Sequence, residues 1–332
     1  MSDYEGVAVY CETKEDKILP IAAEGLGIGR KLADTLGQKL SAVIVGGNIS
    51  GLAQQIISCG ADKVYIVDDL QLKDYQADVY ISVLEKVIKQ VKPQIIIMGQ
   101  TDYGRELAPR LAFRLGTAAT MDCVDLAIDA ESKRLLQTKP VYGGNAQAVF
   151  ITETDPQVVT IRTKAMEALT PDTSRKGESV TIPADLDASV IKTKTLERVV
   201  EEVAGIKIED AQVVVAGGRG IGSADGFKQL DELAKLLKGA VGASRPPCDN
   251  GWIPDMAQVG LTGKIIAPEI YIAVAISGSS QHMSGCSGSK TIIAINRDKE
   301  ANIFRQARFG VIGDWKKVLP AFTQKLKELM AS

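Results

Sequence analysis

The chain has 332 residues, of which 45% are hydrophobic and 24% charged, a composition typical of a globular protein with room for two domains. Its 39 basic and 41 acidic side chains nearly cancel, so the net charge of −2 favours binding neither to nucleic acid nor to an anionic membrane. A single histidine excludes any histidine-rich metal site, and no apolar run approaches the roughly 20 residues of a membrane-spanning helix, so we expect no membrane insertion.

Short apolar runs alternate with helical patterns over residues 6–116. The predicted strands lie at 6–12, 41–47, 63–69 and 93–100. The predicted helices lie at 18–37, 48–60, 75–92 and 104–116. Regular alternation of strand and helix indicates a parallel sheet covered by helices on both faces.

This alternation stops at residues 121–166, where strand-like runs follow one another with turn signals between them. We expect these runs to be antiparallel or mixed strands added to the first domain. Pro, Asp, Ser and Thr then cluster over about 167–198, which predicts a linker. The chain is thereby divided into a first domain over 1–196 and a second over 197–332.

A second α/β unit follows this linker. A strand and a glycine loop are predicted over 211–223, and helices over 225–239 and 315–330. Further strands are predicted at 240–245, 269–278, 291–297 and 309–314. The predicted fold class is therefore α/β with two domains, each built on a mainly parallel sheet with helices on both faces.

Three glycine-rich stretches could be mistaken for one another. GGRGIG, 217–222, follows a strand and precedes a helix, where backbone N–H groups can hold a phosphate. Its spacing is not GxGxxG, because Ser223 stands where the third glycine would fall, so a phosphate loop and a tight turn both stay open. Arg219 inside the turn favours a ligand. By contrast, GLGIGR at 25–30 lies within a helical pattern, and GLTGK at 260–264 lacks the remaining P-loop residues.

Polar or glycine residues occupy the ends of five predicted strands in the second unit. These ends are 217–220, 244–245, 277–278, 296–297 and 313–314. In an open parallel sheet, ligands bind beyond the carboxyl ends of the strands. A helix predicted to begin near Ser279 would add free N–H groups for an anion. The pattern favours a large, extended ligand that carries phosphate, such as a dinucleotide.

At this point the chain resembles a known family. The segments GGRGIGS, AVGASRPPCDNGWIP, QVGLTGKIIAPEIYIAVAISGSSQH, SKTIIAINRDKEANIF and FGVIGDWKKVLP follow one another over 213–320. In this order they resemble the C-terminal domain of the electron transfer flavoprotein alpha subunit (large subunit). KPVYGGNAQAVF (139–150) and TIRTKAM (160–166) resemble its N-terminal domain more loosely.

The resemblance implies a function as well as a fold. It implies an FAD-binding, Rossmann-like second domain and a first domain that contacts the electron transfer flavoprotein beta subunit in a heterodimer. It further implies an electron carrier with no substrate chemistry of its own. Such a carrier shuttles electrons between flavin-dependent dehydrogenases, such as acyl-CoA dehydrogenases, and an acceptor such as a quinone oxidoreductase.

The resemblance also implies contacts with the cofactor at particular residues. Arg219 would lie against the phosphate or ribityl region, and Arg245 against the isoalloxazine, whose reduced, anionic forms its charge would favour. The Thr262 hydroxyl would lie near flavin N5, and His282 would donate a hydrogen bond to the pyrimidine side of the flavin. For Trp315, stacking on adenine and a place as first core residue of the last helix both stay open. The full predicted set is Arg219, Ser244, Arg245, Gln258, Val259, Gly260, Leu261, Thr262, Ser277, Gly278, Ser279, Ser280, Gln281, His282, Asn296, Asp314 and Trp315.

Other functions remain as alternatives. The chain could belong to an electron-bifurcating, NADH-linked complex with a second FAD in the beta subunit and ferredoxin or NAD as further partners. A self-contained flavin or nicotinamide oxidoreductase ranks lower, because cofactor binding already accounts for His282, the best candidate for a general acid or base. The remaining alternative is a nucleotide-binding regulatory protein that does no redox chemistry.

The location is predicted from the cysteines and the first residues. The five cysteines are widely spaced and form no CxxC pair, so we expect reduced thiols and neither a disulfide framework nor a zinc site. The acidic first residues show no signal-peptide pattern. Both observations favour a cytoplasmic protein.

Overall fold

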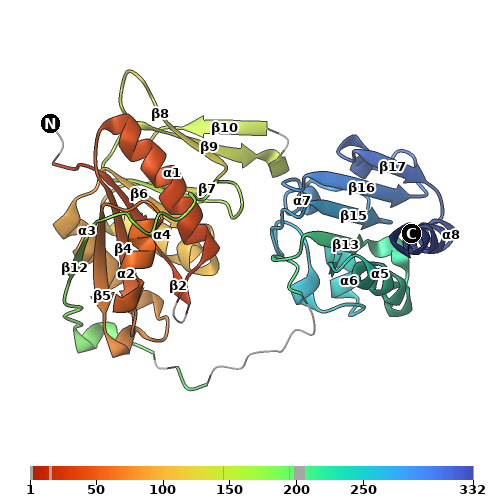
Figure 1. Ribbon diagram of the computed structural model, residues 1–332, viewed down its shortest axis with the longest axis horizontal. Helices are drawn as coiled ribbons and strands as arrows, with labels where there is room; N and C mark the ends of the chain where they lie inside the picture. The colour runs from red at the N-terminus through yellow and green to blue at the C-terminus, as the bar shows by residue number, and fades with distance from the viewer. Residues whose placement is uncertain (1–2, 15–16, 145, 194, 198–205, 332) are drawn as a thin grey trace. The chain divides into compact units, whose positions relative to one another are not determined.

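The structure is a computed structural model that describes residues 3–14, 17–144, 146–193, 195–197 and 206–331 (Figure 1). The chain divides into two compact units. The first consists of Met1–Pro140 and Gln147–Val199, and the second of Val141–Ala146 and Val200–Ser332. Each unit has its own sheet and its own core, so each is described by itself.

A seven-stranded sheet forms the centre of the first unit, and every neighbouring pair of its strands is parallel. In spatial order the strands are β12 (Glu178–Thr181), β5 (Lys63–Asp68), β4 (Leu40–Gly46), β1 (Val7–Tyr10), β6 (Ile95–Gly99), β11 (Gln157–Ile161) and β7 (Ala119–Cys123). Two helices pack on one face, α1 (Pro20–Leu36) and α2 (Ala53–Ser58). Two others pack on the opposite face, α3 (Ala77–Val91) and α4 (Asp102–Arg114).

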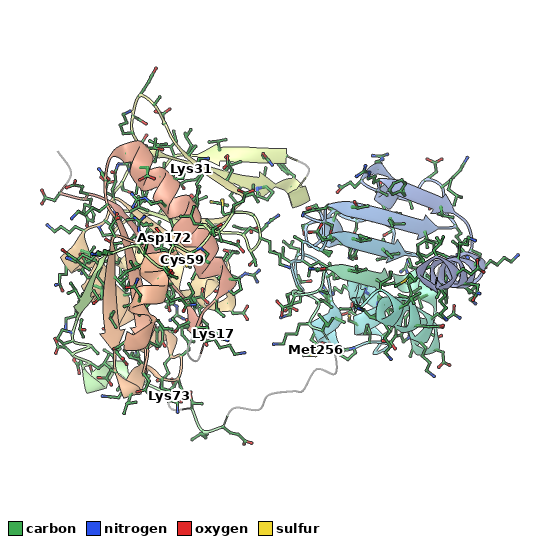
Figure 2. All side chains as sticks on the ribbon, in the orientation of Figure 1. Lys17, Lys31, Cys59, Lys73, Asp172 and Met256 are labelled. Atoms are coloured by element: carbon green, nitrogen blue, oxygen red, sulfur yellow. The ribbon has the colours of Figure 1, made fainter. Side chains whose placement is uncertain are left out.

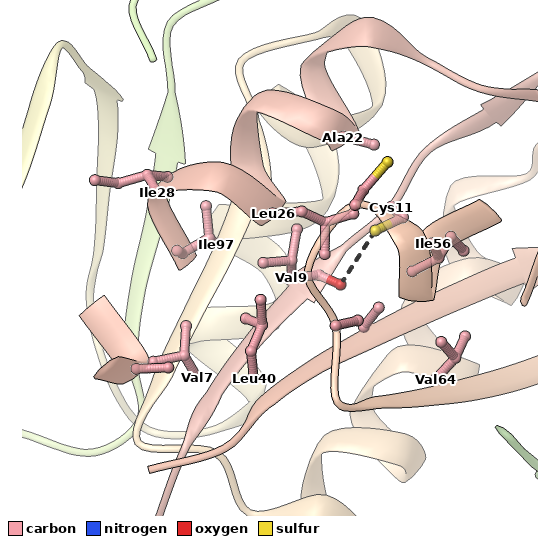
Figure 3. Close-up of a cluster of buried hydrophobic side chains, with 14 of the residues drawn as sticks. Val7, Val9, Cys11, Ala22, Leu26, Ile28, Leu40, Ile56, Val64 and Ile97 are labelled. Atoms are coloured by element: carbon pink, nitrogen blue, oxygen red, sulfur yellow. Dashed lines mark hydrogen bonds between the residues drawn. The ribbon is translucent and has the colours of Figure 1, made fainter. Parts of the chain in front are cut away.

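Aliphatic side chains fill the space between this sheet and α1 (Figure 3). Val9, Leu26 and Ile97 are all at most 1% exposed, and burying one such side chain stabilises the fold by roughly 1.5–3 kcal/mol. Gly25 and Gly29 lie inside α1, where an added Cβ would stand 3.0 Å from Val9. The glycines of 25–30 therefore bring a helix close to the sheet, and this stretch is helical as predicted.

Smaller elements complete the first unit. A three-stranded sheet has the order β10 (Ala146–Phe150), β9 (Leu135–Val141) and β8 (Asp125–Ile128), and β8 and β9 are antiparallel. A short antiparallel hairpin joins β2 (Thr13–Lys14) and β3 (Lys17–Ile18). The single 3-10 turns of this unit are η1 (Ser50–Leu52), η2 (Leu70–Leu72) and η4 (Ala188–Val190), whereas η3 (Tyr142–Gly144) belongs to the second unit. Charged side chains such as Lys31 and Lys73 are exposed on this unit (Figure 2).

The second unit contains a five-stranded parallel sheet. Its strands are β14 (Ala240–Ala243), β13 (Val213–Gly217), β15 (Ile270–Val274), β16 (Thr291–Asn296) and β17 (Phe309–Ile312). Helices α5 (Ala224–Leu236) and α8 (Trp315–Ala331) pack on one face. The other face is covered by α7 (Ser280–Met283) and by irregular segments. The remaining elements are α6 (Arg245–Asp249), η5 (Arg219–Ile221), η6 (Asp255–Ala257) and η7 (Asn302–Arg305).

The predicted fold class, α/β with mainly parallel sheets, is confirmed, but several element predictions need correction. Residues 178–181, predicted as part of a linker, form β12 and pair in parallel with β5. Their side chains are mostly exposed, so no hydrophobic alternation marks this strand in the sequence. The strand predicted over 240–245 ends at Ala243, because Pro246 and Pro247 lack N–H groups and occupy the first turn of α6. Residues 194 and 198 of the predicted linker lie outside the described residues, and the boundary at 196/197 stays a prediction.

Candidate functional site

A cavity of about 730 Å³ lies in the second unit, beyond the carboxyl ends of its strands. All five strands run parallel, so the segments that follow them meet at one edge of the sheet. Of the predicted cofactor residues, all except Gly278 and Ser280 line this cavity. The structure thus brings together segments that are spread over about a hundred residues of sequence, from Gly218 to Lys316.

The glycine turn after β13 forms one wall. The Gly218 N–H donates to Val274 O at 2.9 Å, and an added Cβ at Gly218 would stand 2.1 Å from Ala275 O. The turn therefore needs glycine so that two strand ends can approach each other. Ser223 then begins α5, and its hydroxyl accepts from the Gly226 N–H at 3.4 Å. The segment is a tight turn that also lines the cavity, with the exposed Arg219 side chain among the lining residues.

The segment after β15 adjoins this turn and continues the wall. Ala275 adopts a φ of 55°, a left-handed conformation that costs an alanine about 1–2 kcal/mol, and it lines the cavity. Gly278 has a φ of 79°, and an added Cβ would stand 2.3 Å from Ile303 N. Gly278 therefore lets the chain pass η7 closely, which explains its place outside the cavity lining. Ser279 precedes the single turn of α7, as the sequence predicted.

The loop between η6 and β15 contributes Gln258 to Thr262. The Gln258 side-chain amide donates to the Thr262 hydroxyl at 2.9 Å, and both side chains line the cavity. The Leu261 N–H donates to Gln281 O at 2.8 Å, which joins the loop to α7. The Leu261 side chain is 56% exposed. The loop is thereby fixed at Leu261, while the side chains of Gln258 and Thr262 remain available to a ligand.

His282 differs from the prediction. Its ring is 5% exposed, Nε2 lies 2.8 Å from the Tyr271 hydroxyl and Nδ1 lies 3.0 Å from Val259 O. Both ring nitrogens therefore have protein partners, and no ring N–H is left to donate to a flavin. Burial lowers the pKa of His282 to about 4, so the ring is neutral near pH 7 and supplies no positive charge.

Three further predicted residues hold the cavity together. The Asn296 amide donates to Ile276 O at 2.8 Å, and its side-chain oxygen accepts from the Asp298 N–H at 3.0 Å. Trp315 is 7% exposed within the core between the sheet, α5 and α8, and its indole N–H donates to Gly220 O at 3.0 Å. Of the two interpretations left open for Trp315, the structure supports the core residue. The Asp314 carboxylate accepts from the Lys316 N–H at 3.0 Å at the start of α8.

The cavity lining carries more positive than negative charge. Its cations are Arg219, Arg245, Arg297 and Lys316, and its anions are Asp298 and Asp314. Arg245 pairs with Asp249 at 3.2 Å. Within the described residues, the other three cations have no acidic side chain at ion-pair distance. Such a surface attracts an anionic ligand.

The predictions missed some lining residues. Arg297 and Lys316 are basic residues next to Asn296 and Trp315, and Arg297 belongs to a strand end that the sequence already marked. Ala275 has no sequence signal, because alanine is rarely found at positive φ. Cys248 and Cys286, which are close in sequence to the lining residues Pro246 and His282, are both buried. Burial raises the pKa of Cys248 to about 11, so this thiol is not reactive.

The described residues contain neither a cluster of metal ligands nor a membrane-spanning helix. No group of three or more His, Cys, Asp or Glu side chains there is placed to hold a metal ion. No helix in the same part of the chain combines the length and apolar character needed to cross a membrane.

The residues present fit an extended cofactor with phosphate groups. The cavity volume is within the range of about 300–1,000 Å³ typical of ligand sites. At Gly218, Gly220 and Gly260 an added Cβ would meet neighbouring protein atoms at 2.1–3.0 Å, so these glycines let the segments of the cavity wall pack closely. The unpaired cations of the lining are available to phosphate.

Comparison with known proteins adds independent findings. Residues 7–187 match the electron transfer flavoprotein domain, and residues 207–287 match the electron transfer flavoprotein FAD-binding domain. The chain is 43% identical over 330 residues to the electron transfer flavoprotein subunit alpha of Thermoanaerobacterium thermosaccharolyticum, covering 99% of this chain and 100% of that one. It is 42% identical over 331 residues to the subunit alpha of Megasphaera elsdenii, covering 99% and 98%. It is also 34% identical over 356 residues to the acryloyl-CoA reductase electron transfer subunit beta of Anaerotignum propionicum, covering 99% and 97%.

Proposed function

Because the chain belongs to the electron transfer flavoprotein alpha subunit family and its cofactor is FAD, we propose that it binds FAD in the cavity of the second unit. We propose further that it pairs with a beta subunit and carries electrons from a flavin-dependent dehydrogenase, such as an acyl-CoA dehydrogenase, to a downstream acceptor such as a quinone oxidoreductase. The observation that carries the proposal is a single 730 Å³ cavity lined by residues from all five strand ends.

The charges of the cavity support roles for particular residues. FAD, when bound, supplies the reversible uptake of electrons. Arg219, Arg297 and Lys316 would hold its phosphates, since they are cations of the lining without acidic partners. Arg245 is the second residue after β14 and would place a positive charge near the isoalloxazine. A cation there favours the reduced, more negative form of the cofactor.

The other predicted residues would orient and enclose the cofactor. The Gln258 and Thr262 side chains, joined by a hydrogen bond, would offer polar contacts along one wall. Ser244, Ser277 and Ser279 line the cavity with hydroxyl groups that can donate to phosphate or ring atoms. Asn296 and Trp315 would act by holding strand ends and the glycine turn in place, because their polar atoms already bond to protein.

An exposed apolar surface of the first unit supports a protein partner. Val149 and Phe150 of β10 and the adjoining Ile151 are 58%, 43% and 49% exposed. Consecutive apolar side chains of this size on a surface strand mark an interaction site. We propose that the beta subunit covers this strand.

The location is part of the proposal. The five cysteines are all free and buried, which supports a reducing compartment, and we propose the cytoplasm.

The cavity assignment is tested by comparing two ligands that differ in phosphate. Arg219→Ala should weaken FAD binding to the flavin-free heterodimer by about 10-fold, because a charge-assisted hydrogen bond contributes about 1.5–3 kcal/mol. Binding of riboflavin, which has no phosphate, should change less than about twofold in the same variant. Lys228→Ala is the matched control, since Lys228 is an exposed cation of α5 that pairs with Asp225 away from the cavity. FAD affinity is measured by flavin fluorescence. Equal affinity in the parent, Arg219→Ala and Lys228→Ala would rule out this site.

A further inference from the structure

A buried polar bridge crosses the second unit behind the cavity wall. It begins at Tyr271 of β15, which is 0% exposed, continues through the ring of His282 on α7, and ends at the Val259 carbonyl. The two hydrogen bonds measure 2.8 Å and 3.0 Å. Tyr271 and His282 are 11 residues apart, and His282 and Val259 are 23 apart, so the bridge joins three separate segments.

The chemistry of the three groups fixes which nitrogen carries the proton. A backbone carbonyl only accepts hydrogen bonds, so Nδ1 must be the protonated nitrogen. In the neutral ring Nε2 is then an acceptor, and the Tyr271 hydroxyl must donate to it. Burial lowers the pKa of His282 to about 4, which keeps the ring neutral over the physiological range.

The carbonyl at the end of the bridge belongs to the loop that lines the cavity. The Val259 N–H donates to Ala243 O at the end of β14 at 2.8 Å, so the backbone of Val259 is held on both of its sides. The adjoining Gly260 has a φ of 146°, and an added Cβ would stand 3.0 Å from Gln281 O. An added Cβ at Gly285 would stand 2.3 Å from Gly260 N. Loop and helix therefore touch through backbone, and the imidazole is the side chain that ties them.

We propose that Tyr271 and His282 act together as positioning residues: Tyr271 fixes the Nδ1–H tautomer of His282, and His282 holds the Val259–Thr262 wall of the FAD cavity against α7. This inference rests on the proposed function for the identity of the ligand. It assigns Tyr271 a role although its side chain does not line the cavity.

The tautomer can be observed directly because the chain has one histidine. The full chain is labelled with 15N-histidine and assembled with unlabelled beta subunit, and two-bond proton–nitrogen correlations are recorded at pH 7. Nδ1 should resonate as a protonated nitrogen and Nε2 as an unprotonated acceptor. In Tyr271→Phe the Nε2 signal should move toward that of an acceptor without a hydrogen bond. A protonated Nε2, or an Nε2 signal that does not move in Tyr271→Phe, would overturn the bridge.

The positioning role is tested by FAD affinity in matched variants. His282→Leu should weaken FAD binding by about 10-fold or more, because the Val259 carbonyl is left buried without a donor. His282→Asn should restore affinity to within about threefold of the parent, because its amide can donate where Nδ1 did. Tyr80→Phe is the control, since Tyr80 is a buried tyrosine of the first unit that donates to Leu72 O at 2.7 Å. It should leave FAD affinity unchanged.

The results separate this inference from the proposed function. If the heterodimer takes up no FAD, the proposed function fails, while the histidine spectrum still tests the bridge. If FAD binds and the spectrum agrees but the leucine and asparagine variants bind FAD equally well, the positioning role of His282 is overturned.

Discussion

The pH dependence of the first unit should be governed in part by Glu12. This side chain follows β1, is 4% exposed and accepts a hydrogen bond of 2.5 Å from the Thr101 hydroxyl. Burial raises the pKa of Glu12 from 4.5 to about 7, against the opposing effect of the Thr101 hydrogen bond. The folded state therefore binds a proton that the unfolded chain has already lost between about pH 4.5 and 7. Because each pKa unit corresponds to about 1.4 kcal/mol, stability falls by roughly 3 kcal/mol over this range.

Glu12→Gln removes this ionisation and keeps an acceptor for Thr101. The variant should be more stable than the parent by about 3 kcal/mol at pH 8 and equally stable at pH 4.5. Urea unfolding of the full chain, followed by circular dichroism, measures both values. Both tryptophans, Trp252 and Trp315, lie in the second unit, so their fluorescence follows that unit separately and should not change.

Glu153→Gln is the control, because Glu153 is an exposed glutamate of the same unit. Glu153→Gln should leave the free energy of unfolding unchanged at both pH values. If Glu12→Gln gave the same difference in stability at pH 4.5 as at pH 8, the pKa of Glu12 would be the same in the folded and unfolded chain, and the reasoning would be wrong.

Three further predictions concern the second unit. Trp315→Phe should lower its stability by about 1 kcal/mol in urea unfolding, through loss of the hydrogen bond to Gly220 O; no loss would mean that this bond adds nothing. Gly278→Ala should lower the stability of the second unit more than Gly251→Ala does. Both glycines have a positive φ, but only at Gly278 would the added Cβ meet a backbone nitrogen, at 2.3 Å. Equal losses of stability in the two variants would contradict this crowding. The stability of the second unit, followed by tryptophan fluorescence, should fall as the pH drops from 6.5 toward 4. Burial lowers the pKa of His282 to about 4, so the unfolded chain takes up the proton at a higher pH than the folded chain. A stability that does not change over this range would mean that folding does not lower the pKa of His282.

The sequence predicted much of the framework because its strands are apolar and its turns are marked by glycine. The alternation over 6–116 corresponds to β1, α1, β4, β5, α3, β6 and α4, and the predicted helix 48–60 to η1 with the short helix α2. The edge strand β12 could not be found in this way, because its residues are mostly exposed and only its pairing with β5 makes it a strand.

The sequence predicted where the cavity lies better than it predicted the hydrogen bonds that its residues make. Polar residues at parallel strand ends must meet, so the cavity follows from the pattern. The roles of His282 and Trp315 could not follow, because they depend on partners such as Tyr271 and Gly220 that are distant in sequence. The positive φ of Ala275 depends likewise on its contact with the glycine turn.

We propose that this chain holds FAD as the alpha subunit of an electron carrier. The most direct measurement is a stepwise dithionite titration of the purified heterodimer, followed by visible absorbance, with the FAD released afterwards and counted. We predict one FAD per heterodimer, reduced and reoxidised reversibly. Two FADs per heterodimer would instead support the bifurcating, NADH-linked complex, and a colourless heterodimer that takes up no FAD would contradict the account.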